Sequence, residues 1–337
     1  MSVPFSRRQA LARFGALLAG SPLLRAQQQP PPGDLANTLE FETIAERKLN
    51  RAAYAEITGS NRKGFDRITF RPHLLVNVQQ LDLSLELFGE TLFAPILAGP
   101  ASHQKRFYPE GEVAAARGAS AAKAMTVVAD RSDAPLEEIA AQAGASFWYQ
   151  IYPEQDASAV AGRIRSAVQA GCKAVCLTVG APLQPNQVLD WDYVDRIRQQ
   201  TSVPLLLKGV MNLQEATLAA ERGVQGIVVS NHGGRFVEGL AEPIAALPVI
   251  AEAVGGSIPV LIDGGFRRGS DVLKALALGA TAVLVTRPVL WGLAAYGDAG
   301  VQTVLEMLQT ELASDMAMCG AANLASIKRD FVKVHGR

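Results

Sequence analysis

The chain has 337 residues, of which 49% are hydrophobic, and its 32 Lys and Arg residues balance its 32 Asp and Glu residues. A chain without a basic excess lacks the electrostatic footprint of a nucleic-acid-binding protein. The length is sufficient to bury a sizeable core, either in one large barrel or in two smaller domains.

The N-terminal segment is typical of an export signal. Arg7 and Arg8 stand before a short apolar run, which is the order found in twin-arginine signals, and we place this signal at residues 1–26. The run is too short to span a bilayer as a helix, and an amphipathic arm is the alternative. The proline-rich residues 27–34 are then a spacer. We therefore expect a periplasmic or otherwise exported protein with one folded domain at residues 35–337.

From residue 95 onward the chain repeats a short apolar strand followed by a polar-faced helical stretch, at intervals of roughly 25 residues. The predicted strands are residues 96–99, 124–128, 146–151, 174–179, 205–208, 226–230, 260–262 and 282–285. The predicted helices are residues 113–122, 136–143, 157–170, 193–200, 213–222, 244–254, 272–278 and a last one from residue 290. Continuous Val, Ile and Leu is typical of parallel strands covered on both faces. The pattern predicts an α/β protein with a (β/α)8 TIM barrel, and a doubly wound open sheet is the alternative.

Polar residues recur where these apolar strands end, which is where a barrel gathers its chemistry. Such groups are costly to bury unless something pairs with them, so a polar ligand is expected. Lys208 is the sharpest case, because an ammonium at a barrel mouth needs an anionic or electron-rich partner, and a salt bridge is the alternative. The candidate residues at strand ends are Pro100, Ala101, Ser102, Gln150, Tyr152, Thr178, Lys208, Ser230, Asp263, Thr286 and Arg287.

His232 and Arg235 are delivered by one apolar strand onto a loop that contains Gly233 and Gly234. Histidine titrates near neutrality and can take a proton, and an arginine can fork onto a carboxylate or an oxyanion. A histidine here can also simply hydrogen-bond a turn. Two glycines allow another molecule to approach closely, which favours the catalytic interpretation.

The loops after the last two strands suggest a phosphate site. One carries Asp263, Gly264, Gly265, Phe266 and Arg267, and the other carries Thr286 and Arg287. Glycines expose backbone N–H groups, arginines fork onto phosphate oxygens, and TIM barrels usually hold phosphate at these two loops. Together they favour a phosphorylated cofactor over solvated turns.

The three cysteines, Cys172, Cys176 and Cys319, have no metal-binding spacing. An odd count argues against a disulfide framework. We therefore expect packing roles and no metal site.

With these residues in hand, the chain resembles the FMN-dependent α-hydroxy-acid oxidase and dehydrogenase family, the group of glycolate oxidase and lactate oxidase, over about residues 38–330. The motifs that carry the likeness are Ser-Asn-His-Gly-Gly-Arg at 230–235, Asp-Gly-Gly-Phe-Arg-Arg-Gly at 263–269, Leu-Lys-Gly-Val at 207–210 and Lys-Ala-Leu-Ala-Leu-Gly-Ala at 274–280.

The resemblance implies FMN in the barrel mouth and oxidation of a 2-hydroxy acid. Lys208 would stabilise negative charge on the reduced flavin, His232 would be the base, and Arg235 would hold the substrate carboxylate, with Tyr152 as a substrate contact. The isoalloxazine and ribityl chain would lie against Pro100, Ala101, Ser102, Gln150, Thr178, Lys208 and Ser230, and the phosphate end against Asp263, Gly264, Gly265, Phe266, Arg267, Thr286 and Arg287.

Three positions depart from the family pattern. The family's aspartate that orients the histidine is replaced by Gly180, and a second carboxylate-binding arginine falls near Gln187. The expected tyrosine aligns with Glu56, beside a deletion of about ten residues that is of ordinary surface-loop kind. We expect a more open site and an unpartnered His232 that is a weaker base, because nothing would stabilise its imidazolium.

Two classes of function follow. The first is an exported FMN oxidoreductase that oxidises a 2-hydroxy acid or a related alcohol and passes electrons to oxygen or a respiratory carrier. The second is a flavin-binding barrel with eroded catalysis that serves as a binding or scaffold protein. An FMN-dependent isomerase of the isopentenyl-diphosphate type would share the phosphate loops but not the motif at 230–235. The expected partner is a small molecule, with no nucleic acid and no stable membrane span, and homo-oligomer formation stays open.

Overall fold

The computed structural model describes residues 29–59, 61–182, 189–237 and 239–336. The chain divides into two units, residues 1–36 and 37–337. In the described part of the first unit, the 3-10 turn η1 (Pro32–Asp34) has proline at its start. The expected export signal and Gln187 lie outside the described residues. No helix within the described ranges has the length and apolar character needed to cross a membrane.

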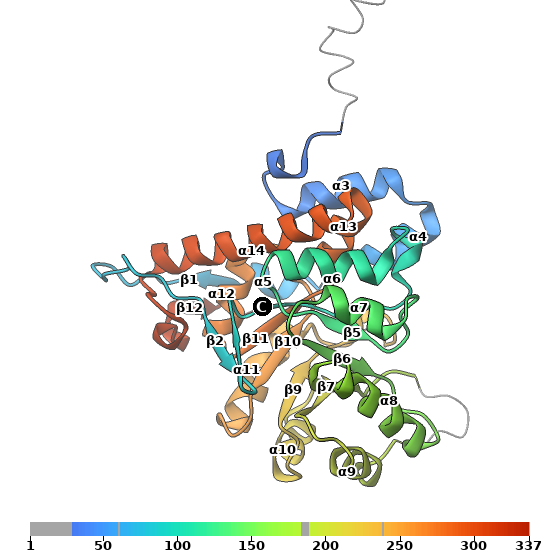
Figure 1. The fold of residues 1–337 in the computed structure, drawn as a ribbon. Coiled ribbons are helices and arrows are strands. Elements are labelled where there is room, and N and C mark those ends of the chain that lie inside the picture. The colour runs from blue at the N-terminus through green and yellow to red at the C-terminus, as the bar shows by residue number, and fades with distance from the viewer. Residues whose placement is uncertain (1–28, 60, 183–188, 238, 337) are drawn as a thin grey trace, which may run out of the picture. The chain divides into compact units, whose positions relative to one another are not determined.

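The second unit is built on a central barrel of eight parallel strands (Figure 1). The sheet order is β4-β11-β10-β9-β8-β7-β6-β5, and a parallel bridge between Ala98 and Thr126 brings its two ends together. The predicted TIM barrel is therefore confirmed. The strands are β4 (Ile96–Ala98), β5 (Val127–Ala129), β6 (Phe147–Ile151), β7 (Cys172–Thr178), β8 (Leu205–Val210), β9 (Gly226–Val229), β10 (Val260–Asp263) and β11 (Ala282–Val285).

Helices separate the barrel strands along the chain, and further helices extend the barrel at both ends of the unit. Those in the repeats are α6 (Gly111–Ala121), α7 (Leu136–Gln142), α8 (Ala157–Gln169), α9 (Trp191–Gln199), α10 (Leu213–Glu221), α11 (Pro243–Val254), α12 (Gly269–Ala277) and α13 (Arg287–Tyr296). The extensions are α3 (Thr38–Lys48), α4 (Arg51–Ile57), α5 (Lys63–Asp66) and α14 (Asp298–Cys319).

One hydrophobic cluster fills the barrel, and a hairpin packs against one end of it. Each strand contributes inward side chains such as Leu97, Trp148 and Leu261. The hairpin of β2 (Leu85–Leu87) and β3 (Glu90–Leu92) adds Leu87 and Leu92 to the same cluster. A β-carbon at Gly226, the first residue of β9, would touch Phe88 of this hairpin at 3.3 Å. The hairpin thus covers the amino ends of the strands, and the carboxyl ends stay available for a site.

The remaining short elements tie the two ends of the second unit together. Strand β1 (Ile68–Phe70) pairs antiparallel with β12 (Val332–Val334). The 3-10 turns are η2 (Gln104–Arg106), η3 (His232–Gly234), η4 (Leu324–Ser326) and η5 (Arg329–Phe331). All three cysteines are buried and free.

The strand expected at 124–128 and the last expected helix differ clearly from the structure. The strand expected at 124–128 begins at Val127, because the chain is still leaving α6 at Lys123, which has φ 55°, and at Ala124, whose N–H bonds Ala119 O. The single helix expected from residue 290 is two helices, α13 and α14, broken at Gly297. This glycine has φ 65° and ψ −140°, and a β-carbon there would lie 2.6 Å from the Tyr108 ring, so a helix cannot run through it.

Helix α12 begins earlier than the expected residue 272. One oxygen of the Asp271 carboxylate accepts the backbone N–H groups of Arg267 at 2.9 Å and Arg268 at 3.0 Å. These donors would otherwise lack partners at the start of the helix. The cap lets the helix begin at Gly269, directly behind the glycine loop that follows β10.

Candidate active site

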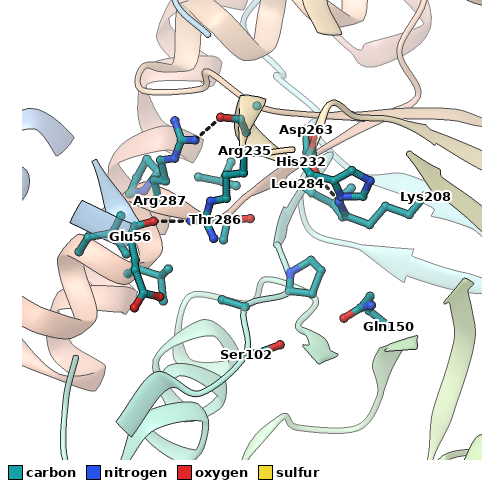
Figure 2. Close-up of a pocket in the computed structure, with 18 of the residues that line it drawn as sticks. Glu56, Ser102, Gln150, Lys208, His232, Arg235, Asp263, Leu284, Thr286 and Arg287 are labelled. Atoms are coloured by element: carbon teal, nitrogen blue, oxygen red, sulfur yellow. Dashed lines mark hydrogen bonds and ion pairs between the residues drawn. The ribbon is translucent and has the colours of Figure 1, made fainter. Parts of the chain in front are cut away.

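A cavity of about 310 Å³ lies at the carboxyl ends of the barrel strands (Figure 2). Every residue that the sequence analysis assigned to the site lines it, except Ser230, which lines a neighbouring cavity. The assigned residues that line it are Pro100, Ala101, Ser102, Gln150, Tyr152, Thr178, Lys208, His232, Arg235, Asp263, Gly264, Gly265, Phe266, Arg267, Thr286 and Arg287.

Lys208 is both part of the cavity wall and one half of a buried salt bridge. Its Nζ lies 2.7 Å from Asp263 Oδ2 and donates to Ser230 Oγ at 3.1 Å. The two charged side chains are only 8% and 11% exposed. The ammonium is therefore not lone, and the salt-bridge alternative holds together with the site assignment. Asp263 Oδ1 is buried and has no hydrogen-bond partner within the described residues, so it can accept from a ligand.

Gln150 and Thr178 line the same wall from neighbouring strands. The Gln150 amide Nε2 donates to Thr178 Oγ1 at 2.7 Å, and both side chains are buried. The backbone carbonyl of Gln150 accepts the N–H of Asp130 at 2.8 Å. The bond from Gln150 Nε2 to Thr178 Oγ1 fixes the orientation of the Gln150 side-chain amide. The polar groups of this wall are therefore already arranged before any ligand binds.

His232 sits at the start of η3 with its backbone in the left-handed region, at φ 52°. The Asn231 side chain accepts the Gly233 N–H at 3.1 Å, which holds this turn. His232 Nε2 lies 2.8 Å from the carbonyl oxygen of Val179. The expectation of an unpartnered histidine is therefore wrong: the partner is a backbone carbonyl, contributed by the residue before Gly180.

The electrostatic surroundings of His232 favour its neutral form. Burial lowers its pKa from the ordinary 6.5, and the nearby Lys208 charge acts in the same direction. The Val179 carbonyl and the Asp263 carboxylate oppose this shift without cancelling it. Since a carbonyl can only accept, Nε2 carries the proton in the neutral ring, and Nδ1 is the nitrogen with a free lone pair.

Two arginines mark the other end of the cavity. Arg267 is 5% exposed, its guanidinium donates to the carbonyls of Phe266 and Gly59, and it stacks over Trp291 at 4.4 Å. Burial, followed by repulsion from Arg287, lowers the pKa of Arg267 to about 10. Arg287 Nη2 donates to Gly233 O at 2.9 Å. A buried guanidinium and a half-buried one that repel each other form a region that an anion would stabilise.

Exposed Arg235 and half-buried Tyr152 also line the cavity. Arg235 is exposed and donates from Nη2 to the backbone oxygen of Glu56, as Figure 2 shows. The guanidinium of Arg131 lies over the Tyr152 ring, 4.5 Å from its centroid. The site thus has a cation on the β9 loop and another on the loop after β5.

Sequence reasoning missed four polar residues of this wall. Glu56 and Arg106 form an ion pair inside the lining, and His103 and Arg131 also line it. His103 and Arg106 follow Pro100–Ser102 closely, so their place after β4 was a usable signal, whereas Glu56 comes from α4 and no strand end points to it. Glu56 was noted only as a replacement for a family tyrosine.

A second cavity, of about 490 Å³, also reaches His232 and is lined by Val179, Gly180, Gly209 and Trp191 among others. A β-carbon at Gly209 would lie 2.8 Å from His232 Nε2, and one at Gly180 would lie 3.8 Å from it. At these two positions the chain presents backbone alone to this edge of the imidazole. Gly180, where the resemblance led us to expect an aspartate, is part of the wall of this second cavity.

The sequence profile described as FMN-dependent dehydrogenase matches residues 47–188 and 183–334. The chain belongs to this family. It is 35% identical to a peroxisomal (S)-2-hydroxy-acid oxidase of Oryza sativa subsp. japonica over 89% of this chain and 96% of the relative. It is 36% identical to an L-lactate oxidase of Nostoc sp., over 88% and 97%. A crystal structure of mandelate oxidase with (S)-2-phenylpropionate superposes with a TM-score of 0.86 and 34% identity, over 90% of this chain and all of that one.

Membership confirms the expected family, the enzyme class and FMN as the cofactor, and the residues of the 310 Å³ cavity fit this group. Buried Arg267 and half-buried Arg287 are cations suited to the phosphate, and Asp263 Oδ1 is a buried acceptor suited to a hydroxyl. Gly265 has φ 90°, and a β-carbon there would collide with the Asn61 carbonyl. The position therefore requires glycine, and the backbone of this loop packs directly against the backbone of Asn61. When bound, FMN supplies the two-electron acceptor of the reaction.

Proposed function

We propose that the protein oxidises a small 2-hydroxy acid to the corresponding 2-oxo acid, with His232 as the base and Arg235 as the carboxylate anchor. The observation that carries the proposal is the placement of both side chains on one short turn after β9, facing the FMN cavity (Figure 2). A base and an anion anchor three residues apart can act on neighbouring atoms of one small substrate.

His232 is prepared to take a proton at Nδ1. Its Nε2 proton is held by Val179 O, and its lowered pKa keeps the ring neutral at physiological pH. Oxidation of a hydroxy acid releases two electrons and two protons. In the proposed reaction His232 takes one proton, and bound FMN would accept the two electrons and the other proton.

Arg235 presents the second contact. A guanidinium has five N–H donors, and one of them is used by the Glu56 carbonyl, so others remain for a carboxylate. The side chain is exposed, which lets a substrate reach it from solvent. We propose oxygen or a respiratory carrier as the acceptor to which bound FMN would pass the electrons.

The test compares His232→Ala and Arg235→Ala by anaerobic stopped-flow reduction of bound FMN with a panel of 2-hydroxy acids. His232→Ala should retain yellow FMN but lose reduction by every substrate. Arg235→Ala should be reduced only at much higher substrate concentration, because it removes an anchor rather than the base. Reduction of His232→Ala at the parental rate would show that the histidine is structural.

One observation favours a second candidate, a flavin-binding barrel with weakened catalysis. No carboxylate hydrogen-bonds to His232 within the described residues, and Lys208 disfavours its charged form. This candidate would be supported if the parent protein binds FMN but no hydroxy acid or alcohol bleaches it. Bleaching by neutral alcohols, unaffected in Arg235→Ala, would instead favour an oxidoreductase for non-carboxylate alcohols.

A further inference from the structure

The cavity holds more positive charge than one carboxylate and the cofactor require. Six cationic side chains line it but only two acidic ones, Glu56 and Asp263. Each acid already has a cationic partner, Arg106 for Glu56 and Lys208 for Asp263. A phosphate monoester supplies a charge of about −1.5 to −2, which suits Arg267 and Arg287. Arg235 and Arg131 are the cations that remain.

Arg131 is not neutralised by its own neighbours. Asp130 accepts from Tyr149 at 2.9 Å and lies 3.3 Å from Arg163, and Asp133 accepts from His103 at 2.9 Å. No ion pair of Arg131 occurs within the described residues. Its guanidinium is exposed and rests on the Tyr152 ring, an arrangement that leaves its N–H donors available at the edge of the stack.

The loop that carries Arg131 is fixed to the loop after β4. The Arg131 carbonyl accepts the N–H of His103 at 3.1 Å, and the Asp133 carboxylate accepts the N–H of Lys105 at 3.0 Å. Ser132 Oγ donates to Ala129 O at 2.6 Å. These bonds hold the backbone on both sides of Arg131, so the cation is positioned at the cavity rather than carried on an untied loop.

Arg131 and Arg235 approach the cavity from opposite sides. Arg131 follows β5 and Arg235 follows β9, and in the sheet order these strands stand four places apart in a ring of eight. His232 and Arg235 together account for the reacting carbon and its carboxylate. In the proposed binding mode, a cation on the opposite wall would therefore face the far end of the substrate.

We infer that Arg131 binds a second carboxylate, so that the preferred substrates are 2-hydroxy dicarboxylic acids. This inference rests on the proposed function, because it assumes that His232 and Arg235 hold the 2-hydroxy-acid end. The doubly charged substrate and the phosphate together match the cationic excess of the cavity. A neutral far end would leave Arg131 without a counter-charge.

The experiment uses two probes that differ only in the distal carboxylate, 2-oxoglutarate and 2-oxopentanoate. Binding to the oxidised holoenzyme is followed by the change in flavin absorbance, which needs no turnover. The parent should bind the dicarboxylate at least about tenfold more tightly, as expected for one charge-assisted contact. Arg131→Gln should abolish this preference, and Arg131→Lys should keep part of it. Arg165→Gln, which alters an exposed arginine of α8 that lines neither cavity, should keep all of it.

The reduction rates with 2-hydroxyglutarate and 2-hydroxypentanoate give a second readout. Arg131→Gln should raise the concentration for half-maximal reduction with the dicarboxylate only. An unchanged preference in Arg131→Gln, a parent that prefers the monocarboxylate, or an equal loss for both probes would overturn the inference and leave the proposed function standing. A parent that neither binds nor oxidises any of the four acids would overturn the proposed function itself.

Discussion

Gly180 stands directly beside the imidazole of His232, since a β-carbon at this glycine would lie 3.8 Å from His232 Nε2. The same nitrogen donates to the carbonyl of Val179, at 2.8 Å. A carbonyl fixes the tautomer of the ring as a carboxylate would, but it carries no full negative charge. The ring is therefore oriented for proton transfer while its protonated form receives little stabilisation.

Replacing Gly180 with Asp should raise the pKa of His232 and strengthen it as a base. Gly180 has φ 72°, a region that Asp and Asn tolerate better than most residues. An anion within about 4–6 Å favours the charged imidazole, so the acid limb of the pH profile for flavin reduction should move upward by about one pH unit. Gly180→Asn is the matched control, because it adds the same bulk without charge. Equal profiles for the two variants would contradict this account.

In the unmodified protein, His232 should stay neutral, and so able to act as a base, at a lower pH than an ordinary histidine. Burial and Lys208 lower the pKa of His232, so the neutral base persists below the ordinary value of 6.5. Flavin reduction should be more than half-maximal at pH 6.5 and should fall with a midpoint below 6.5 as the pH drops through the lowered pKa. Rapid-mixing experiments between pH 5 and 8 check this. A midpoint above 6.5 would mean that the Val179 carbonyl and Asp263 outweigh burial.

Breaking the Lys208–Asp263 pair should destabilise the protein strongly. Removing one partner leaves a buried charge uncompensated, so Asp263→Ala should lower the free energy of unfolding by about 3 kcal/mol. The exposed pair of Lys173 and Glu90, at 3.6 Å, supplies the control, and Glu90→Ala should cost less than about 1 kcal/mol. Urea unfolding followed by circular dichroism, with and without FMN, measures both. Equal losses would show that cavity water already screens Lys208.

The barrel could be predicted from sequence because its strands are continuous apolar runs and its helices alternate with them. The start of β5 and the break at Gly297 could not, because each depends on a contact made after folding. Lys123 adopts a left-handed turn behind α6, and Tyr108 packs where a side chain at Gly297 would stand. Secondary-structure propensities of neighbouring residues carry no information about either feature.

The site divides in the same way. Lys208, Asp263 and Thr178 were predictable because they lie at or near the carboxyl ends of apolar strands that meet at one face of the barrel. The partner of His232 was not, since it is a backbone carbonyl and every residue has one. Glu56 was hidden for another reason: it reaches the cavity from α4, far from the repeating units.

Export should depend on the paired arginines near the N-terminus. The order of Arg7, Arg8 and the apolar run predicts a twin-arginine signal, and lysine keeps the charge but is not read equivalently by this route. Changing both arginines to lysine should leave the protein in the cytoplasm with its FMN bound. Cell fractionation with the parent as reference tests this. Unchanged export, or a parent that is not exported, would favour the alternative of an amphipathic arm.

Arg267 and its neighbour Arg268 should differ sharply in their effect on FMN. Arg267 is buried at the cavity beside Arg287, whereas Arg268 points away and pairs with Glu311 at 2.8 Å. A charge-assisted hydrogen bond contributes about 1.5–3 kcal/mol, so Arg267→Ala should weaken FMN binding by at least about tenfold. Arg268→Ala, the matched control, should bind FMN like the parent. Fluorescence titration of FMN into the stripped protein gives both dissociation constants, and if Arg267→Ala binds FMN as tightly as the control, the phosphate lies elsewhere in the cavity.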